Sequence, residues 1–250
     1  MQIIQISDSH LSRDKPDRAS ELASCIQYIN SLQSQPDAVI HTGDVAHNGL
    51  SEEYAEAKAI LDRLKAPYFV LAGNRDHRAN LIAAFADGDH LRPGMDFVQY
   101  AVEDFATRLI VVDSVSETNK GSMCAARLQH VEAMLAADSS RPAAVFVHHP
   151  PFEVSVGPEP RHYQVWREAE QLAAAIGRHR QVCGLFCGHV HRGFETRLGA
   201  LPAHVVSCVV SDVRWDTPQA AEQGVPVFKR FELKGTSDDP DKTGTAMLAD

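Results

Sequence analysis

The sequence predicts a layered α/β protein. Three observations support this prediction. Short apolar runs rich in β-branched residues recur along the chain, longer segments with apolar residues at helical spacing separate them, and no internal repeat or low-complexity linker interrupts the pattern. A length of 250 residues suits one large domain of this class. We therefore expect a single domain over residues 1–234 and a flexible C-terminal tail over residues 235–250.

The first third of the chain alternates strands and helices. Apolar, β-branched runs predict strands at Gln2–Ser7, Ala38–Thr42 and Tyr68–Leu71. Apolar residues at helical spacing predict helices at Arg18–Gln33, Ser51–Leu64 and Leu81–Ala86. Ser51 is the expected N-cap of the second helix, because Glu52 and Glu53 follow it in the first turn, where the helix dipole favours negative charge.

The rest of the chain continues the alternation and then changes to strands. Strands are predicted at Phe97–Val102, Leu109–Asp113, Ala143–Val147 and Val182–Cys187, and helices at Arg127–Ala137 and Gln164–Arg178. A spacing of two then predicts strands at Phe194–Leu198, Ala203–Val209 and Val227–Leu233. Four prolines and a glycine predict irregular structure over Pro150–Tyr163. Residues 235–250 have too little apolar area to offset the entropy of ordering, which predicts the tail.

Composition excludes several classes of partner. The formal net charge is −9, from 24 Lys and Arg against 33 Asp and Glu, and this charge repels a nucleic-acid polymer. No apolar run reaches the roughly 18 residues of a membrane-spanning helix, and the start MQIIQISDSH lacks the features of a secretory signal. Five cysteines, an odd number, suit reduced thiols better than a disulfide framework. We therefore expect a cytoplasmic protein without a membrane partner.

Clusters of polar residues follow five of the predicted strands. They are Ser7-Asp8-Ser9-His10, Thr42-Gly43-Asp44, Ala72-Gly73-Asn74-Arg75-Asp76-His77, His148-His149-Pro150-Pro151 and Gly188-His189-Val190-His191. In layered α/β folds the loops at the carboxyl ends of the strands form the ligand crevice. We therefore expect the five clusters to meet at one end of the fold.

The residue types in these clusters are those of metal ligands. Carboxylate oxygen and neutral imidazole nitrogen together suit dications such as Zn²⁺, Mn²⁺ and Fe²⁺. The pairs Asp8-x-His10 and His189-x-His191, in extended segments, place both side chains on one side of the backbone. Glycines precede three of the clustered residues and permit sharp turns and close approach of the backbone. Seven ligands exceed one tetrahedral site and suit two metals that share a carboxylate.

The order of the motifs resembles the calcineurin-like metallophosphoesterase superfamily. The resemblance rests on Asp8-x-His10, Gly43-Asp44, Gly73-Asn74, His148 and Gly188-His189-x-His191. The stretches IIQISDSH, VHHPP, CGHVH and DFATRLIVVDS further resemble its bacterial branch of class III cyclic nucleotide phosphodiesterases and glycerophosphodiesterases. The likeness runs from about residue 1 to about residue 210. It implies a four-layer αββα sandwich with a short C-terminal β extension, which agrees with the alternation of elements.

The resemblance also implies which residues hold two divalent metal ions. One ion would be held by Asp8, His10, Asp44 and His191, and the second by Asp44, Asn74, His148 and His189. Asp44 would then bridge the two ions. The metals of this family are Mn, Fe or Zn, and the ligand types do not decide among them.

One family motif is altered in this sequence. The family has a histidine after the asparagine, where it stabilises the transition state or the leaving group, whereas this chain has Arg75, then Asp76 and His77. Arg75 offers a permanent charge and two donors to phosphate, but a guanidinium stays protonated at ordinary pH and cannot donate a proton to a leaving group. The candidate catalytic residues are therefore Asn74, Arg75 and His77, with surface roles as the alternative for Arg75 and His77.

Four more residues lie near the motifs. His41 is expected to be a core histidine or to orient a ligand. His149 is expected to pack beside the ligand His148. His162 and Tyr163 are expected in a surface turn, with substrate contact as the alternative.

The resemblance implies a metal-dependent phosphodiesterase. A metal-activated hydroxide would attack the phosphorus of a small phosphodiester, either a 3′,5′-cyclic nucleotide or a glycerophosphodiester. A broad phosphomonoesterase or phosphotriesterase on the same metal core is the first alternative, and a non-catalytic binding module is the second. A homo-oligomer is compatible with the resemblance.

Overall fold

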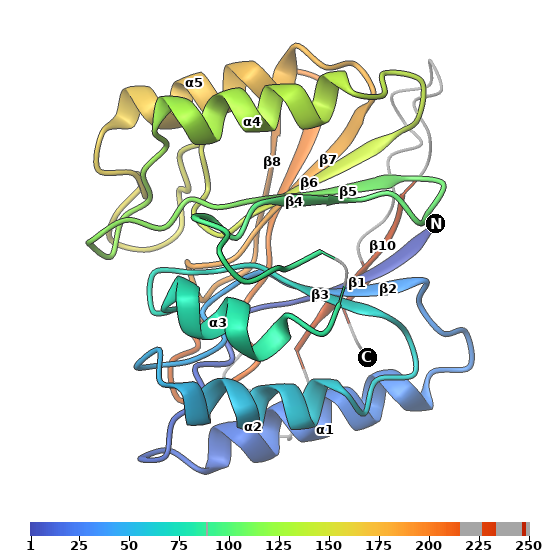
Figure 1. Ribbon diagram of the computed structural model, residues 1–250, viewed down its shortest axis with the longest axis vertical. Coiled ribbons are helices and arrows are strands. Elements are labelled where there is room, and N and C mark those ends of the chain that lie inside the picture. The colour runs from blue at the N-terminus through green and yellow to red at the C-terminus, as the bar shows by residue number, and fades with distance from the viewer. Residues whose placement is uncertain (89, 216–226, 234–246, 249–250) are drawn as a thin grey trace.

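Two β-sheets lie face to face between two layers of helices (Figure 1). The computed structural model describes residues 1–88, 90–215, 227–233 and 247–248. Helices α1 (Asp17–Ser31), α2 (Ser51–Leu61) and α3 (Arg78–Phe85) cover one sheet, and α4 (Ala125–Ala136) and α5 (Trp166–Gly177) cover the other. The predicted four-layer αββα sandwich is confirmed.

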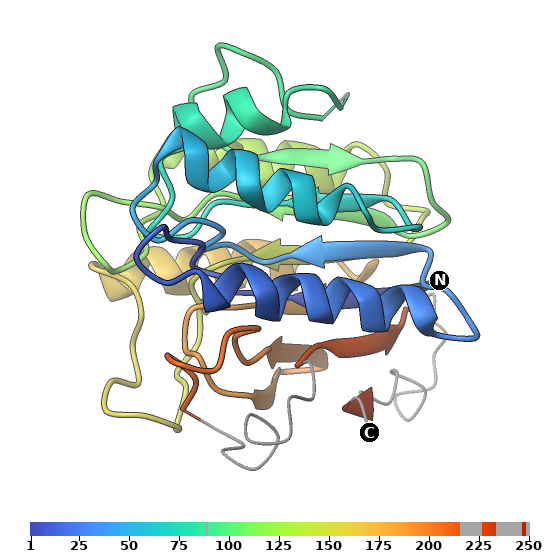
Figure 2. The same ribbon diagram turned by 90° about the horizontal axis from the view of Figure 1, so that it is seen from below.

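The first sheet has five strands in the order β11-β10-β1-β2-β3. These strands are β1 (Gln2–Ile6), β2 (Ala38–His41), β3 (Tyr68–Val70), β10 (Lys229–Glu232) and β11 (Met247–Leu248). β1, β2 and β3 are parallel, and β10 joins the other side of β1 in the antiparallel direction. Figure 2 shows α1, α2 and α3 side by side over this sheet, in the order in which they occur along the chain.

The second sheet has six strands in the order β4-β5-β6-β7-β9-β8. These strands are β4 (Tyr100–Val102), β5 (Arg108–Val112), β6 (Ala143–Val147), β7 (Val182–Cys187), β8 (Phe194–Leu198) and β9 (Leu201–Val205). β5, β6, β7 and β9 run parallel, with β4 and β8 antiparallel at the two edges. The predicted strands after Gly193 thus extend both sheets, since β8 and β9 join this one and β10 joins the other.

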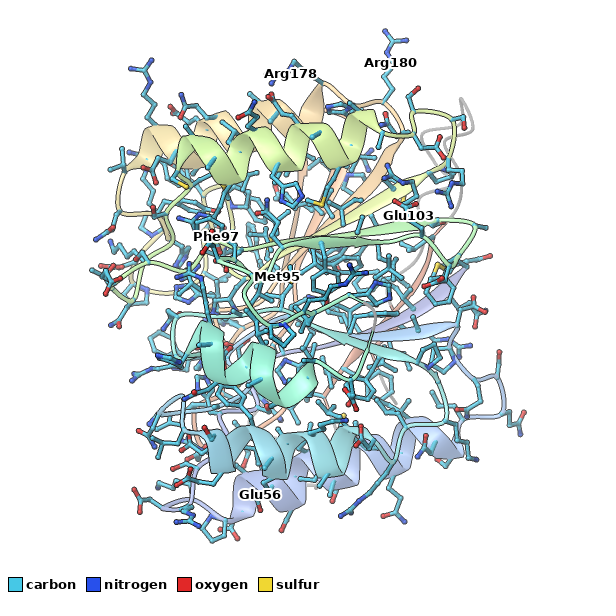
Figure 3. The ribbon with its side chains drawn as sticks, viewed as in Figure 1. Glu56, Met95, Phe97, Glu103, Arg178 and Arg180 are labelled. Carbon is cyan, nitrogen blue, oxygen red and sulfur yellow. The ribbon has the colours of Figure 1, made fainter. Side chains whose placement is uncertain are left out.

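Burial follows the hydrophobic pattern of the sequence. Every residue of β5 and β6 is buried, as expected for parallel strands covered on both faces. In α1 the spaced apolar residues, such as Leu22 and Ile29, are buried against the sheet. Charged side chains, among them Glu56 on α2 and Arg178 and Arg180 beyond α5, point away from the sheets (Figure 3). No helix among the described residues is long and apolar enough to cross a bilayer.

The predicted N-cap of α2 is wrong. Leu50 is the N-cap residue, and Ser51 is the first residue of the helix. The buried carboxylate of Glu53 accepts the backbone N–H groups of Asn48 at 2.9 Å and Leu50 at 3.2 Å. Because Glu53 binds these backbone donors, the helix begins without a hydroxyl at its cap.

Two predicted strands have different bounds in the structure. The run Phe97–Val102 is a strand only from Tyr100, because the N–H of Val98 donates to the Asp113 carboxylate at 2.9 Å and not to a neighbouring strand. The run Ala203–Val209 stops at Val205, and beyond it the N–H of Val209 donates to the carbonyl of Ser7 at 2.9 Å. Most of the predicted tail lies outside the described residues, although Met247–Leu248 forms β11. The domain boundary after residue 234 stays a prediction.

Arg108 is a charged residue inside the second sheet, with its side chain 1% exposed. Its guanidinium donates to both carboxylate oxygens of Glu103, at 2.9 and 2.7 Å, and to the carbonyl of Met134 at 2.8 Å. The opposite case is Arg178, which is exposed and forms an exposed ion pair with Glu132. The two arginines therefore allow a matched comparison of buried and exposed charge.

We expect Arg108→Ala to lower the free energy of unfolding by about 2–4 kcal/mol, because it leaves buried acceptors without a donor. Arg178→Ala should cost less than about 1 kcal/mol, as is usual for an exposed pair. Urea denaturation of the two variants and the unchanged protein measures both values. Equal losses in the two variants would contradict the role given to Arg108.

Candidate metal centre

The five predicted clusters meet at one end of the sandwich. β1 runs away from the N-terminus marked in Figure 1, and the clusters follow the carboxyl ends of β1, β2, β3, β6 and β7. Backbone hydrogen bonds join the loops: Asp8 N–H donates to the Gly43 carbonyl at 2.9 Å, and Gly188 N–H to the His148 carbonyl at 3.1 Å. The expectation drawn from the carboxyl ends of the strands is confirmed.

Four of the predicted ligands form a first group. Asp8, His10, Asp44 and His191 each offer a ligand atom, and these atoms all lie within 4.8 Å of one another. His191 Nε2 is 3.3 Å from Asp8 Oδ1 and 3.0 Å from His10 Nε2. His10 Nε2 is 3.6 Å from Asp44 Oδ2. One ion could therefore contact all four side chains.

A second group lies on the other side of Asp44. Asn74 Oδ1 is 3.2 Å from His148 Nε2 and 2.9 Å from His189 Nδ1. Asp44 Oδ1 is 3.6 Å from His148 Nε2, while its other oxygen faces the first group. Asp44 is thus the side chain that the two groups share. The structure brings together all seven residues that the sequence singled out as ligands.

The hydrogen bonds of two histidines turn lone pairs into the site. His148 Nδ1 lies 2.8 Å from the carbonyl of Thr42, and His191 Nδ1 lies 3.0 Å from the carbonyl of Val213. A carbonyl only accepts, so each Nδ1 carries a proton, and in the neutral ring Nε2 is then an acceptor. His148 Nε2 faces Asn74 Oδ1, which is an acceptor as well. Burial acts to lower the pKa of His191, but a hydrogen bond to Asp8 and the charge of Asp8 outweigh it and raise that pKa, so His191 Nε2 carries a proton towards Asp8 Oδ1 until a metal takes its place. A cation between His148 Nε2 and Asn74 Oδ1 removes the repulsion, so the donor set fits a bound metal.

Burial shapes the protonation of the site. It lowers the pKa of three imidazoles and keeps them neutral, the form that binds a metal; these are His10, His148 and His189. Burial and the Asp8 charge raise the pKa of Asp44. Burial also acts to raise the pKa of Asp8, but a hydrogen bond and the charge of His191 outweigh it and hold that pKa low. Two adjacent carboxylates therefore need positive charge between them before both ionise easily.

The backbone at the site is strained. Among the described residues other than glycine, the positive φ angles are those of Asp8 (56°), His10 (45°), Asp44 (52°), His189 (72°) and His191 (56°), all predicted ligands. Such residues cost on the order of 1–3 kcal/mol each and persist only where their surroundings hold them. At His10 the buried Arg18 helps, since its guanidinium donates to the His10 carbonyl at 3.0 Å and also binds Asp212.

Glycines allow the loops to approach one another closely. A Cβ atom on Gly73 would lie 2.2 Å from Asp44 Oδ1, and one on Gly43 would lie 2.6 Å from His148 Nδ1. A Cβ on Gly188 would lie 2.1 Å from Ser7 Oγ. These distances leave no room for a side chain, so the three glycines serve the close approach that the sequence predicted.

Asp76 organises the site, and sequence analysis assigned it no role. Its buried carboxylate accepts the N–H groups of Val45 at 3.2 Å, Ala46 at 3.0 Å and Gly73 at 2.8 Å, and the Tyr54 hydroxyl at 3.1 Å. It thereby ties the loop that carries Asp44 to the loop that carries Asn74. Burial and the Asp44 charge raise the pKa of Asp76 to about 7. Its position two residues after Asn74 was the only signal in the sequence.

Arg75 and His77, from the motif that differs from the family pattern, lie in different surroundings. Arg75 has an exposed side chain, and its backbone N–H donates to Asp44 Oδ1 at 2.7 Å. The exposed His77 is the N-cap of α3, where its Nδ1 accepts the N–H of Asn80 at 3.4 Å. Neither belongs to the two ligand groups, and their catalytic roles stay predictions.

The four neighbouring residues are all buried. His41 Nε2 bonds to the hydroxyl of Ser9, between Asp8 and His10, at 2.9 Å, as expected of a residue that orients ligands. The surface turn expected for His162 and Tyr163 is wrong, because the irregular segment folds back over the site and places the His162 ring centroid 4.9 Å from that of His189.

His149 both packs beside the predicted ligand His148 and offers a ligand atom to the second group. It packs against His148, as expected, and it also offers a ligand atom within 4.8 Å of those of His148 and His189. Its Nδ1 lies 2.8 Å from the hydroxyl of Ser114. The sequence placed this residue correctly but gave no sign of its reach towards the ligands.

A shared carboxylate between two ligand groups, at the carboxyl ends of a four-layer αββα sandwich, defines the class of metal-dependent phosphoesterases. Residues 1–193 match the family described as calcineurin-like phosphoesterase. The chain belongs to this family and is a metallophosphoesterase, a hydrolase whose family uses divalent metals.

Three known proteins illustrate what the chain is similar to. A probable glycerophosphodiester phosphodiesterase of Arcobacter nitrofigilis is 34% identical over 200 residues, which cover 77% of this chain and 72% of that protein. A probable cyclic nucleotide phosphodiesterase of Rhodopseudomonas palustris is 30% identical over 261 residues, which cover 100% of this chain and 89% of that protein. A dimetal phosphatase from Danio rerio shares the fold, with a TM-score of 0.73 at 14% identity over 99% of this chain and 98% of that one.

We expect Mn²⁺ or Zn²⁺ to stabilise the metal-free protein, because positive charge relieves the facing acceptors. Free ion about 100-fold above its Kd adds about 2.7 kcal/mol, or about 5–10 °C in Tm for a chain of this size. Thermal unfolding followed by circular dichroism, before and after chelation, measures the shift. Asp44→Ala should lose most of it, whereas His179→Ala, remote from the ligand groups, should keep it. A full shift in Asp44→Ala would contradict the arrangement.

Proposed function

We propose that the protein is a dinuclear metal-dependent phosphodiesterase that hydrolyses small phosphodiesters, either 3′,5′-cyclic nucleotides or glycerophosphodiesters. The observation that carries the proposal is the position of Asp44, whose two oxygens face two separate ligand groups. Relatives at 30% identity or more are named for each of the two substrate classes, which supports both and selects neither.

The two ligand groups suggest how the ions would be held. Asp8, His10, Asp44 and His191 would hold one ion, and Asp44, Asn74, His148 and His189 the second. The mixture of carboxylate, amide and imidazole suits Mn, Fe or Zn. Two dications carry four positive charges, and the two ionised aspartates carry two negative charges. The site would then attract an anionic ester on a protein whose net charge is −9.

The chain's own residues would position the reaction. A pair of divalent ions would supply Lewis acidity and lower the pKa of water towards neutrality. His148 and His191, fixed by the carbonyls of Thr42 and Val213, would keep their Nε2 atoms in place as ligands. The exposed guanidinium of Arg75, anchored through its backbone to Asp44, would contact a phosphoryl oxygen. Since Arg75 cannot give up a proton, the leaving alkoxide would be protonated by His77 or by water.

A phosphomonoesterase or phosphotriesterase on the same core is the alternative, since the metal ligands do not select the ester. A non-catalytic binding module is less well supported, because all seven ligand positions hold residues that bind metals. The proposal includes a cytoplasmic location and no nucleic-acid polymer as substrate.

Hydrolysis of three substrates by the manganese-loaded protein tests the proposal. We expect cyclic AMP or glycerophosphocholine to be turned over faster than the monoester p-nitrophenyl phosphate, and chelation to abolish all turnover. Product release is followed by phosphate-coupled and chromatographic assays. A monoester hydrolysed far faster than either diester would favour the alternative, and turnover that survives chelation would contradict the metal mechanism.

Arg75→Ala should lower kcat/KM for the preferred diester by about 10–100-fold, because a charge-assisted contact to the phosphoryl group is lost. Metal-induced stabilisation should persist, since the backbone N–H to Asp44 remains. Arg75→Lys should recover part of the loss by restoring a point charge. Arg178→Ala removes an equal charge far from the site and is the control. An unchanged kcat/KM in Arg75→Ala would mean that Arg75 does not contact the substrate.

A further inference from the structure

The indole of Trp215 lies unusually open to solvent. It is 57% exposed, and among the described residues the other large apolar side chains this open are Leu50 and Val165. Tryptophan buries most of its surface in a typical fold, so an exposed one at a functional edge suggests a binding role. Its neighbours place it at the metal centre.

Two hydrogen bonds tie this segment to a predicted metal ligand. The backbone N–H of Trp215 donates to the His191 carbonyl at 3.1 Å, and His191 Nδ1 donates to the Val213 carbonyl at 3.0 Å. Between them, Arg214 donates to the carbonyls of Cys208 at 3.0 Å and Val209 at 2.5 Å. The backbone that carries Trp215 is therefore fixed, while more than half of its side chain is open to solvent.

The ring also lies beside the irregular segment that borders the second ligand group. A Cβ atom on Gly157 would lie 3.9 Å from the Trp215 ring, so the ring is the nearest group that a side chain at this position would meet. The same segment ends at His162, whose ring packs against His189. The backbone of Trp215 thus bonds to the ligand residue His191, and its ring faces the loop that ends against His189.

This placement suits contact with the part of a substrate that is not phosphate. In a cyclic nucleotide the ribose separates the base from phosphorus, so the base must lie to one side of the ions. A fixed, exposed aromatic ring is the usual surface on which a base stacks, and the contact is tolerant of base identity. A glycerol moiety has no π-face and gains little from it.

We propose that Trp215 is a specificity-determining residue that stacks on the base of a nucleotide substrate and favours such diesters over glycerophosphodiesters. This inference rests on the proposed function and chooses between its two substrate classes.

Tryptophan fluorescence gives a test that needs no turnover. The chain has two tryptophans, and Trp166 lies under the guanidinium of Arg161, 4.8 Å from its ring centroid. In Trp166→Phe, which leaves Trp215 as the single tryptophan, the manganese-loaded protein should show saturable quenching by 5′-AMP and none by glycerol 3-phosphate. In the matched variant Trp215→Phe, 5′-AMP should leave the remaining fluorescence unchanged after correction for absorbance.

Kinetics separate stacking from a structural role. Trp215→Ala should raise KM for cyclic AMP about tenfold, within the range for loss of one stacked base, and change KM for glycerophosphoglycerol, which has no cationic headgroup to bind the indole, less than about twofold. Trp215→Phe should keep most of the affinity, because a ring remains. An equal loss on both substrates would mean that the substitution acts through His191, and it would overturn the inference.

The two proposals fail in different ways. Hydrolysis of cyclic AMP without quenching in Trp166→Phe would overturn the stacking contact and leave the phosphodiesterase intact. Quenching by 5′-AMP in a protein that hydrolyses no diester would defeat the proposed function and still support the contact at Trp215.

Discussion

Acceptor atoms that point at one another dominate the chemistry of this molecule. Because His148 donates its Nδ1 proton to the main-chain carbonyl of Thr42, its Nε2 lone pair faces the oxygen of Asn74, and the carboxylates of Asp8 and Asp44 lie together in the first group. Such an arrangement is repulsive unless positive charge lies within it. The left-handed ligand residues and the glycines without room for a Cβ keep the acceptors together, and the surrounding fold must hold this strain in place.

The two sheets meet that requirement through the ends of their parallel strands. Four of the seven predicted ligands follow β1, β2 and β3, and the other three follow β6 and β7. The facing sheets bring the two sets into contact. Polar residues behind the site then fix the loops. Asp76 binds three backbone N–H groups, and Arg18 binds the carbonyl of His10. These contacts lie directly behind the ligands, so the site depends on a few buried polar side chains as much as on the core.

Short patterns in the sequence predicted a layered α/β fold and metal-type residues at the ends of its strands, and the resemblance to the metallophosphoesterases implied the four layers and the two ligand sets. Buried strands are apolar runs, and a metal site at their ends is a cluster of Asp, Asn and His directly after each run. Contacts between distant segments left no such trace. Nothing near Asp76 indicates that its carboxylate turns back to Val45, and nothing near His162 indicates that its loop folds over His189. The predicted N-cap of α2 was wrong for a related reason. The side chain of Glu53 turns back along the chain and accepts a backbone N–H just before the helix, so Ser51 is not needed as a cap.

The pairing of β10 with β1 has a consequence for biosynthesis. Gln2 lies opposite Glu232, so one of the first strands to leave the ribosome waits for one of the last before that side of its ladder closes. Until then β1 presents unpaired backbone groups to other nascent chains. Closure over so great a sequence separation is intrinsically slow. Chains that stop before β10 therefore keep one side of β1 open to pairing with other strands.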